Sequence, residues 1–147
     1  MRRASLITVI VAVAALAFVA ATGGAVGPSR VHASMTARQA VPPLSVRGTG
    51  AFRGTIQRVK RRWVLRWSLS YRRLSSPAIS GQLRLGAKGQ WGTGLVGLCR
   101  PCRVAAGGVK PITASVRKAI LSGRAYALVE TRKYRRGEIR GQVVRGG

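Results

Sequence analysis

Acidic side chains are almost absent from this sequence. Glu130 and Glu138 are the two carboxylates, and they stand against 27 lysine and arginine residues, which gives a formal net charge of +25. A mechanism that needs a carboxylate as acid, base or nucleophile therefore has only these two residues to use. Such an excess of positive charge favours a polyanionic partner, such as nucleic acid, lipid head groups or an anionic polymer. A compositional surplus of arginine that serves no ligand is the alternative.

The N-terminus has the layout of an export signal. Arg2 and Arg3 precede an apolar run over residues 6–21, and Val31-His32-Ala33 forms a small-x-small sequence. This order of basic, apolar and small residues is typical of a secretory signal peptide. We predict a signal peptide over residues 1–33 and a protein that is secreted or held in the cell envelope.

Histidine is missing from the mature chain if cleavage follows Ala33, because His32 is the one histidine in the sequence. Cleavage after Ala21 or Ala25 is an alternative. An uncleaved membrane anchor is another, although the apolar run is shorter than the roughly 20 residues that span a bilayer.

Cysteine is equally scarce, with Cys99 and Cys102 as the two residues of this type. An intramolecular disulfide is the expected state of such a pair in an exported protein. A redox-active pair is the alternative, but it usually places the first cysteine at a helix N-terminus, and here a glycine-containing loop follows Cys102. A zinc site would need two further cysteine or histidine ligands, which the sequence does not offer.

Alternating side chains give the clearest structural signal. Trp63, Leu65, Trp67, Leu69 and Tyr71 alternate with Val64, Arg66, Ser68 and Ser70. This period of two predicts a strand with one buried face. Stacking of the three aromatic residues on single-stranded nucleic acid is the alternative to a role in the core.

Short apolar runs and glycine-rich turns continue along the chain. They predict an all-β fold, a Greek-key-like antiparallel β-sandwich or barrel of about seven short strands, with one short helix near 115–122. We expect residues 34–45, which are polar and include Pro42-Pro43, to form a disordered lead-in. Residues 46–147 are expected to form the β-domain.

Basic residues gather in the turns between these expected strands, where they are candidates for anion binding. They are Lys60, Arg61, Arg62, Arg72, Arg73, Arg132, Lys133, Arg135 and Arg136.

Two runs near the C-terminus follow a known pattern. Residues 123–131 read Gly-Arg-Ala-Tyr-Ala-Leu-Val-Glu-Thr, and residues 137–142 read Gly-Glu-Ile-Arg-Gly-Gln. They resemble the end of the chordin-type (CHRD) domain, where Gly-x-x-Tyr-x-x-Val-His-Thr is followed by a turn and Gly-Glu-Ile-Arg-Gly-Gln. Upstream, residues 79–92 resemble the family's His-Ile-His segment and glycine-rich turn, and residues 98–102 resemble the cysteine segment of bacterial members. The likeness covers residues 46–144.

The resemblance implies an extracellular all-β domain, and bacterial members of the family mostly lack a known biochemical activity. The family motif is expected to be structural, and it consists of Gly137, Glu138, Ile139, Arg140, Gly141 and Gln142. The family's histidines would suggest a metal site, but Gln82 and Arg84 stand at the His-x-His positions and Glu130 stands at the Val-His-Thr histidine. We therefore expect no metal and no cofactor, and we predict that Arg84 and Glu130 form an ion pair in place of the histidines.

The sequence as a whole predicts a secreted or envelope-associated binding or structural domain with a cationic surface and no catalytic activity. Anionic polymers or a membrane surface are the expected partners, and no small-molecule substrate is indicated. One alternative is an extracellular nucleic-acid or anionic-polymer binding protein that uses the basic aromatic strand. The other is a thiol–disulfide redox protein that uses Cys99 and Cys102.

Overall fold

The computed structural model describes residues 27–146, so the predicted signal peptide lies outside the described residues except for its last seven, 27–33. The elements are β1 (Ser29–Thr36), the short 3-10 helix η1 (Ala37–Gln39), β2 (Thr49–Val59), β3 (Arg62–Arg72), β4 (Ala78–Leu85), β5 (Gly94–Cys99), β6 (Ala105–Ile112), α1 (Ala114–Leu121), β7 (Ala125–Thr131), β8 (Ile139–Gln142) and β9 (Val144–Arg145). The predictions of an all-β fold and of one short helix are confirmed.

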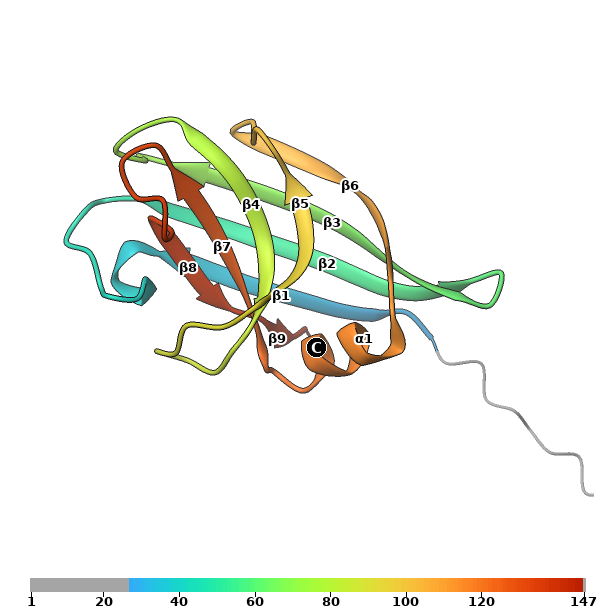
Figure 1. The fold of residues 1–147 in the computed structure, drawn as a ribbon. Coiled ribbons are helices and arrows are strands. Elements are labelled where there is room, and N and C mark those ends of the chain that lie inside the picture. Colours follow the sequence, from blue (N-terminus) through green and yellow to red (C-terminus); the bar gives the residue numbers. More distant parts are fainter. Residues whose placement is uncertain (1–26, 147) are drawn as a thin grey trace, which may run out of the picture.

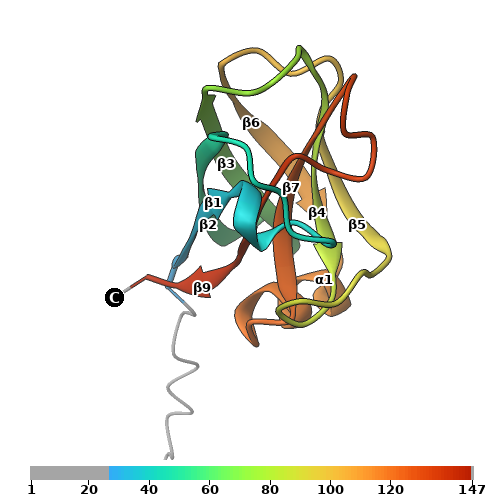
Figure 2. The same cartoon turned by 90° about the vertical axis from the view of Figure 1, so that its left-hand side faces the viewer.

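The strands form one antiparallel sheet in the order β5-β4-β7-β8-β1-β2-β3-β6, and β9 pairs with β1. The sheet curls round until its end strands, β5 and β6, contact each other, which nearly closes a barrel (Figures 1 and 2). Residues 27–146 contain nine strands, where about seven were predicted for the domain. The additional strands are β1 and β9, which lie side by side.

Apolar side chains from both halves of the sheet fill the barrel. Phe52, Leu65, Leu83 and Val129 are fully buried, and they come from β2, β3, β4 and β7. The alternation predicted in β3 is present, because Leu65, Trp67 and Leu69 are buried while Arg66, Ser68 and Ser70 are exposed. Trp67 is only 7% exposed, so its ring is not available as a stacking platform.

The structure differs from the prediction for residues 34–45. Ser34–Thr36 completes β1, and Ala37 and Ala40 are buried. The strand begins at Ser29 and pairs with β2 along its whole length. Its apolar residues Val31, Ala33 and Met35 point into the core, which is why this polar-looking segment is ordered. The β-domain therefore starts at Ser29 and not at residue 46.

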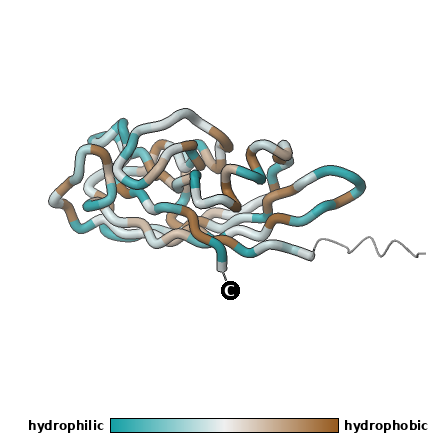
Figure 3. Tube along the Cα trace, turned by 90° about the horizontal axis from the view of Figure 1, so that it is seen from below, coloured by the Kyte–Doolittle hydropathy of each residue, from teal (hydrophilic) through white to brown (hydrophobic). Residues whose placement is uncertain are grey.

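Two short local features shape one end of the barrel. The hydroxyl of Thr113 accepts a hydrogen bond from the backbone N–H of Val116 and caps α1. At the same end of the barrel, β2 and β3 are joined by the two-residue turn Lys60-Arg61, and both residues have positive φ angles of 44° and 68°. This hairpin projects beyond the rest of the sheet, and Figure 3 shows its tip in hydrophilic colouring.

Candidate functional site

The outer face of β4 and β7 brings together the positions at which the family pattern has histidine. Gln82 and Arg84 alternate along β4, and Glu130 lies on the neighbouring strand β7. The Glu130 carboxylate accepts hydrogen bonds from the Ser80 hydroxyl and, at 2.6 Å, from the Gln82 amide nitrogen. Two of these three positions, Gln82 and Glu130, are therefore in direct contact.

The hydrogen bonds of Arg84 differ from the predicted ion pair. Its Nε and Nη2 atoms donate to the carbonyl oxygen of Gly92 at 3.0 and 2.5 Å, and its Nη1 atom donates to the Gln82 side-chain oxygen at 3.4 Å. The register places Arg84 opposite Tyr126, four residues along β7 from Glu130, a separation of roughly 13 Å. Gln82 lies between the two charges, and its amide links them.

Trp91 lies in the loop between β4 and β5, and two guanidinium groups stack on its ring. The Arg84 guanidinium is 4.6 Å from the ring centroid, and that of Arg136 is 5.0 Å away. Trp91 is 38% exposed, so part of the ring still faces solvent. The cation–π contacts fix Arg84 over the loop, which explains why its charge is turned away from Glu130.

Arg140 of the family motif also holds the β4–β5 loop. It is 2% exposed, and it donates hydrogen bonds to the carbonyl oxygens of Gln90 at 2.6 Å and Ala87 at 2.7 Å. Its guanidinium lies 3.6 Å from the ring centroid of Tyr126. Burial lowers the pKa of Arg140 from its usual value. The side chain is therefore fully engaged inside the protein.

Glu138 of the motif is a buried carboxylate without exposed surface. It accepts hydrogen bonds from the backbone N–H of Ser75 at 2.6 Å, from the Ser75 hydroxyl at 2.9 Å and from the Thr131 hydroxyl at 2.9 Å. These contacts join the β3–β4 loop to the end of β7. Gly137 has a φ of +107°, and a Cβ added there would lie 2.3 Å from Leu128, so the close turn requires glycine.

Cys99 and Cys102 form a disulfide, with their Cα atoms 5.0 Å apart. It closes the short loop at the end of β5, and the carbonyl oxygen of Cys102 accepts a hydrogen bond from the Tyr71 hydroxyl at 2.9 Å. Burial raises the pKa of Tyr71 above its usual value. The pair thus ties β5 to β3, and no helix begins at either cysteine.

The predicted anion-binding residues divide into two groups. The hairpin-tip cluster consists of Lys60, Arg61 and Arg62, and the end-loop cluster consists of Arg72, Arg73, Arg132, Lys133, Arg135 and Arg136; all of them are exposed. Since Arg62 and Arg72 are the two ends of β3, the clusters are separated by roughly 33 Å. The nine residues therefore do not form one patch.

The end-loop cluster is assembled by hydrogen bonds between two loops. The backbone N–H of Lys133 donates to the Ser76 hydroxyl at 2.9 Å, and that of Arg132 donates to the carbonyl oxygen of Pro77 at 3.1 Å. The Glu138 contacts to Ser75 reinforce the same junction. Residues that are distant in sequence thus present their charges at one end of the barrel (Figure 1).

The family model of the CHRD domain matches residues 31–143. The chain belongs to the CHRD domain family. The matched range begins within β1, so β1 belongs to the CHRD domain. Comparisons with curated proteins and with solved structures give no match.

One cationic surface of the CHRD domain was missed by the sequence analysis. Arg30 and His32 on β1 lie beside Arg53 on β2, on the outer face of the sheet. The two β1 residues had been assigned to the signal peptide and were left out for that reason. The alternation of exposed Arg30, His32 and Ser34 with buried Val31 and Ala33 is the signal that could have found them.

Within residues 27–146, no three His, Cys, Asp or Glu side chains are grouped so that they could hold a metal ion. Over the same residues, no helix is long and apolar enough to cross a membrane.

Proposed function

We propose that this CHRD domain is exported and binds anionic polymers of the cell envelope without catalysing a reaction. The observation that carries the proposal is the unbalanced charge of the end-loop cluster. Six exposed arginine and lysine side chains are held together there by contacts between two loops. Their mutual repulsion is relieved when a polyanion binds, because each bound phosphate, sulfate or carboxylate neutralises one of them.

The two carboxylates do not offset this charge. The side-chain and backbone donors to Glu130 and Glu138 come from Ser75, Ser80, Gln82 and Thr131, which are all neutral. Glu138 is buried at the junction beneath the end-loop cluster and acts there as a structural acceptor. Glu130 is held by two hydrogen bonds, and a general base or nucleophile would have to give these up. This use of both carboxylates supports a binding role rather than catalysis.

Binding of the mature protein to heparin, measured over a series of salt concentrations, tests the proposal. We expect the logarithm of the association constant to fall linearly with the logarithm of salt concentration, as counterion release requires. Replacing Arg132, Lys133 and Arg135 with glutamine should reduce both the affinity and the slope. Replacing Lys60, Arg61 and Arg62 is the matched control, because it removes the same number of charges at the opposite end. Absence of binding at low salt would contradict the proposal.

A further inference from the structure

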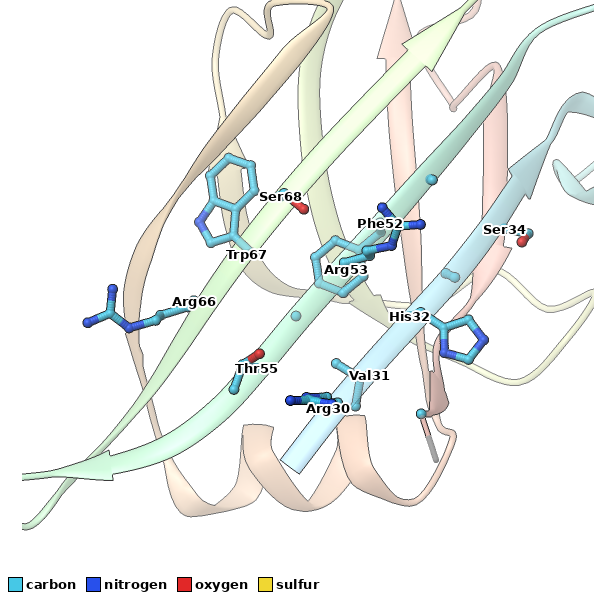
Figure 4. Close-up of a pocket in the computed structure, with 14 residues that line it drawn as sticks. Arg30, Val31, His32, Ser34, Phe52, Arg53, Thr55, Arg66, Trp67 and Ser68 are labelled. Atoms are coloured by element: carbon cyan, nitrogen blue, oxygen red, sulfur yellow. The ribbon is translucent and has the colours of Figure 1, made fainter. Parts of the chain in front are cut away.

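The outer face of β1, β2 and β3 carries a shallow hollow of about 590 Å³ (Figure 4). We call it the strand groove and define it by its four basic residues, Arg30, His32, Arg53 and Arg66, all of which are exposed. It lies between the hairpin-tip cluster and the end-loop cluster, because Arg62, Arg66 and Arg72 all lie on the outer face of β3. Its residues come from three adjacent strands, so the sheet itself fixes their spacing.

The register of the strands sets how these charges are arranged. Thr55 on β2 is directly opposite Arg30 on β1 and Arg66 on β3. The two arginines therefore flank this threonine, and their Cα atoms are roughly 10 Å apart, which is two strand spacings. Arg53 is directly opposite His32 in the next row of the same face. Two arginines on the same face of a sheet, separated by about 10 Å, repel each other unless a counter-charge lies between them. The protein supplies none here, because Glu130 lies on β7 and Glu138 in the loop that precedes β8.

Small polar side chains form the rest of the groove. Ser34, Thr55 and Ser68 add hydroxyl groups, and Ala51 adds a small apolar side chain opposite Ser34. The aromatic residues nearby do not contribute rings to this surface, because Phe52 and Trp67 are 0% and 7% exposed. A base or a sugar ring would therefore find no partner for stacking, whereas the oxygen atoms of phosphate match the donor geometry of guanidinium groups.

We infer that the strand groove binds a linear polymer of phosphate groups that carries no bases, laid across β1, β2 and β3. The inference rests on the proposed function and names both the face and the chemical class of its ligand. Arg53 and Arg66 hold successive phosphates, and the serine and threonine hydroxyls donate hydrogen bonds to the oxygens between them. Arg30 and His32 close the groove on the β1 side.

Calorimetric titration of the mature protein with long-chain inorganic polyphosphate tests this assignment. The groove variant replaces both Arg53 and Arg66 with glutamine. The control variant replaces Lys88 and Arg100, which are exposed in the β4–β5 and β5–β6 loops outside the groove, and it removes the same number of charges. We expect the groove variant to bind polyphosphate about tenfold more weakly. The slope of the logarithm of its association constant against the logarithm of salt concentration should become smaller by about one to two. The affinity of the control variant should fall by less than about threefold. Near-ultraviolet circular dichroism verifies that both variants remain folded.

The same titrations distinguish an error in the assignment of the strand groove from an error in the proposed polyanion-binding function. Equal losses in the two variants would overturn the groove and leave general polyanion binding in place. Absence of polyphosphate and heparin binding by the unaltered protein at low salt would overturn both. Titrations with single-stranded DNA and with hyaluronate test the ligand class. Tighter binding of either polymer than of polyphosphate, lost in the groove variant, would overturn the assignment to phosphate chains without bases.

Discussion

The Gln82 amide and the Glu130 carboxylate are joined across β4 and β7 by a hydrogen bond of 2.6 Å. The same amide accepts a hydrogen bond from Arg84, so a neutral side chain links a positive and a negative charge that do not meet. These residues occupy the three positions at which the CHRD pattern has histidine. The arrangement connects β4 and β7 through the hydrogen bonds of Gln82 and contains no histidine.

A double-mutant cycle measures this linkage. We expect the alanine variants of Gln82 and Glu130 to be coupled by about 1 kcal/mol in free energy of unfolding, because a hydrogen bond to a charged group is lost. The coupling between Arg84 and Glu130 should be only a few tenths of a kcal/mol, and it should vanish when Gln82 is already alanine. Urea denaturation of the seven variants and the unaltered protein supplies the values. An Arg84–Glu130 coupling larger than that of Gln82 would contradict the bridging role.

Glu138→Ala should destabilise the domain by about 2–4 kcal/mol. The change leaves the backbone N–H of Ser75 and the hydroxyls of Ser75 and Thr131 without their acceptor in a buried site. Urea denaturation measures the loss, and Arg135→Ala, at an exposed position of the neighbouring loop, is the control with an effect below about 0.5 kcal/mol. Equal effects of the two changes would show that the carboxylate does not hold the junction.

Replacing Lys60-Arg61 with Asn-Gly should stabilise the domain by about 1 kcal/mol. Both residues adopt positive φ angles in a two-residue hairpin turn, a conformation that asparagine and glycine tolerate better than long side chains do. The midpoint of thermal unfolding should therefore rise. Arg66→Gly, at an extended position of β3, is the control and should lower it. A lower midpoint for the turn variant would show that its long side chains contribute contacts that outweigh the backbone strain.

Removal of the disulfide separates a structural role from a redox role. Changing Cys99 and Cys102 together to serine should cost about 2 kcal/mol of stability, a modest loss because the closed loop is very short. Affinity for heparin should stay within about twofold of the unaltered protein when both are measured well below their unfolding midpoints. If a folded variant lost binding altogether, the cysteines would have a functional role that the binding proposal does not include.

Export should leave β1 intact. Cleavage after Ala33 would remove Ser29–Ala33, including two buried residues of the core, so we expect processing after Ala21 or Ala25 instead. Mass spectrometry of the exported protein should find an N-terminus at Thr22 or Val26. A chain produced from Val26 onward should fold, whereas one produced from Ser34 onward should not. An exported, folded protein that begins at Ser34 would contradict this prediction.

The sequence predicted well the elements whose pattern is local. The alternation from Trp63 to Tyr71 identified β3, because successive side chains of a strand point to opposite faces and only one face is buried. The short helix was predicted at 115–122 and lies at Ala114–Leu121, where Thr113 and Gly123 mark its ends. The CHRD motif was readable because Gly137 is required by a turn and Gly141 by the close approach of β8 to Ser34.

Two features depended on information that no local pattern carries. The alternation in β1 was present, but Val31-His32-Ala33 also fits a cleavage site, and the competing interpretation removed the strand. The partner of Glu130 depended on the register between β4 and β7, which is set by packing of the whole sheet. The sequence could indicate that Gln82, Arg84 and Glu130 lie on one face of the sheet, but it could not indicate which of them contact each other.

Strand β6 is an edge of the sheet, and this edge bears on the solubility of the protein. An exposed edge strand can pair with the edge of another molecule and begin aggregation. In β6, Pro111 has no N–H to offer, and the adjacent Lys110 places a charge beside the exposed Val109. Combined with a net charge of +25, this edge disfavours strand-to-strand association between copies. The basic composition therefore also disfavours pairing between copies at the edge that the nearly closed barrel leaves open.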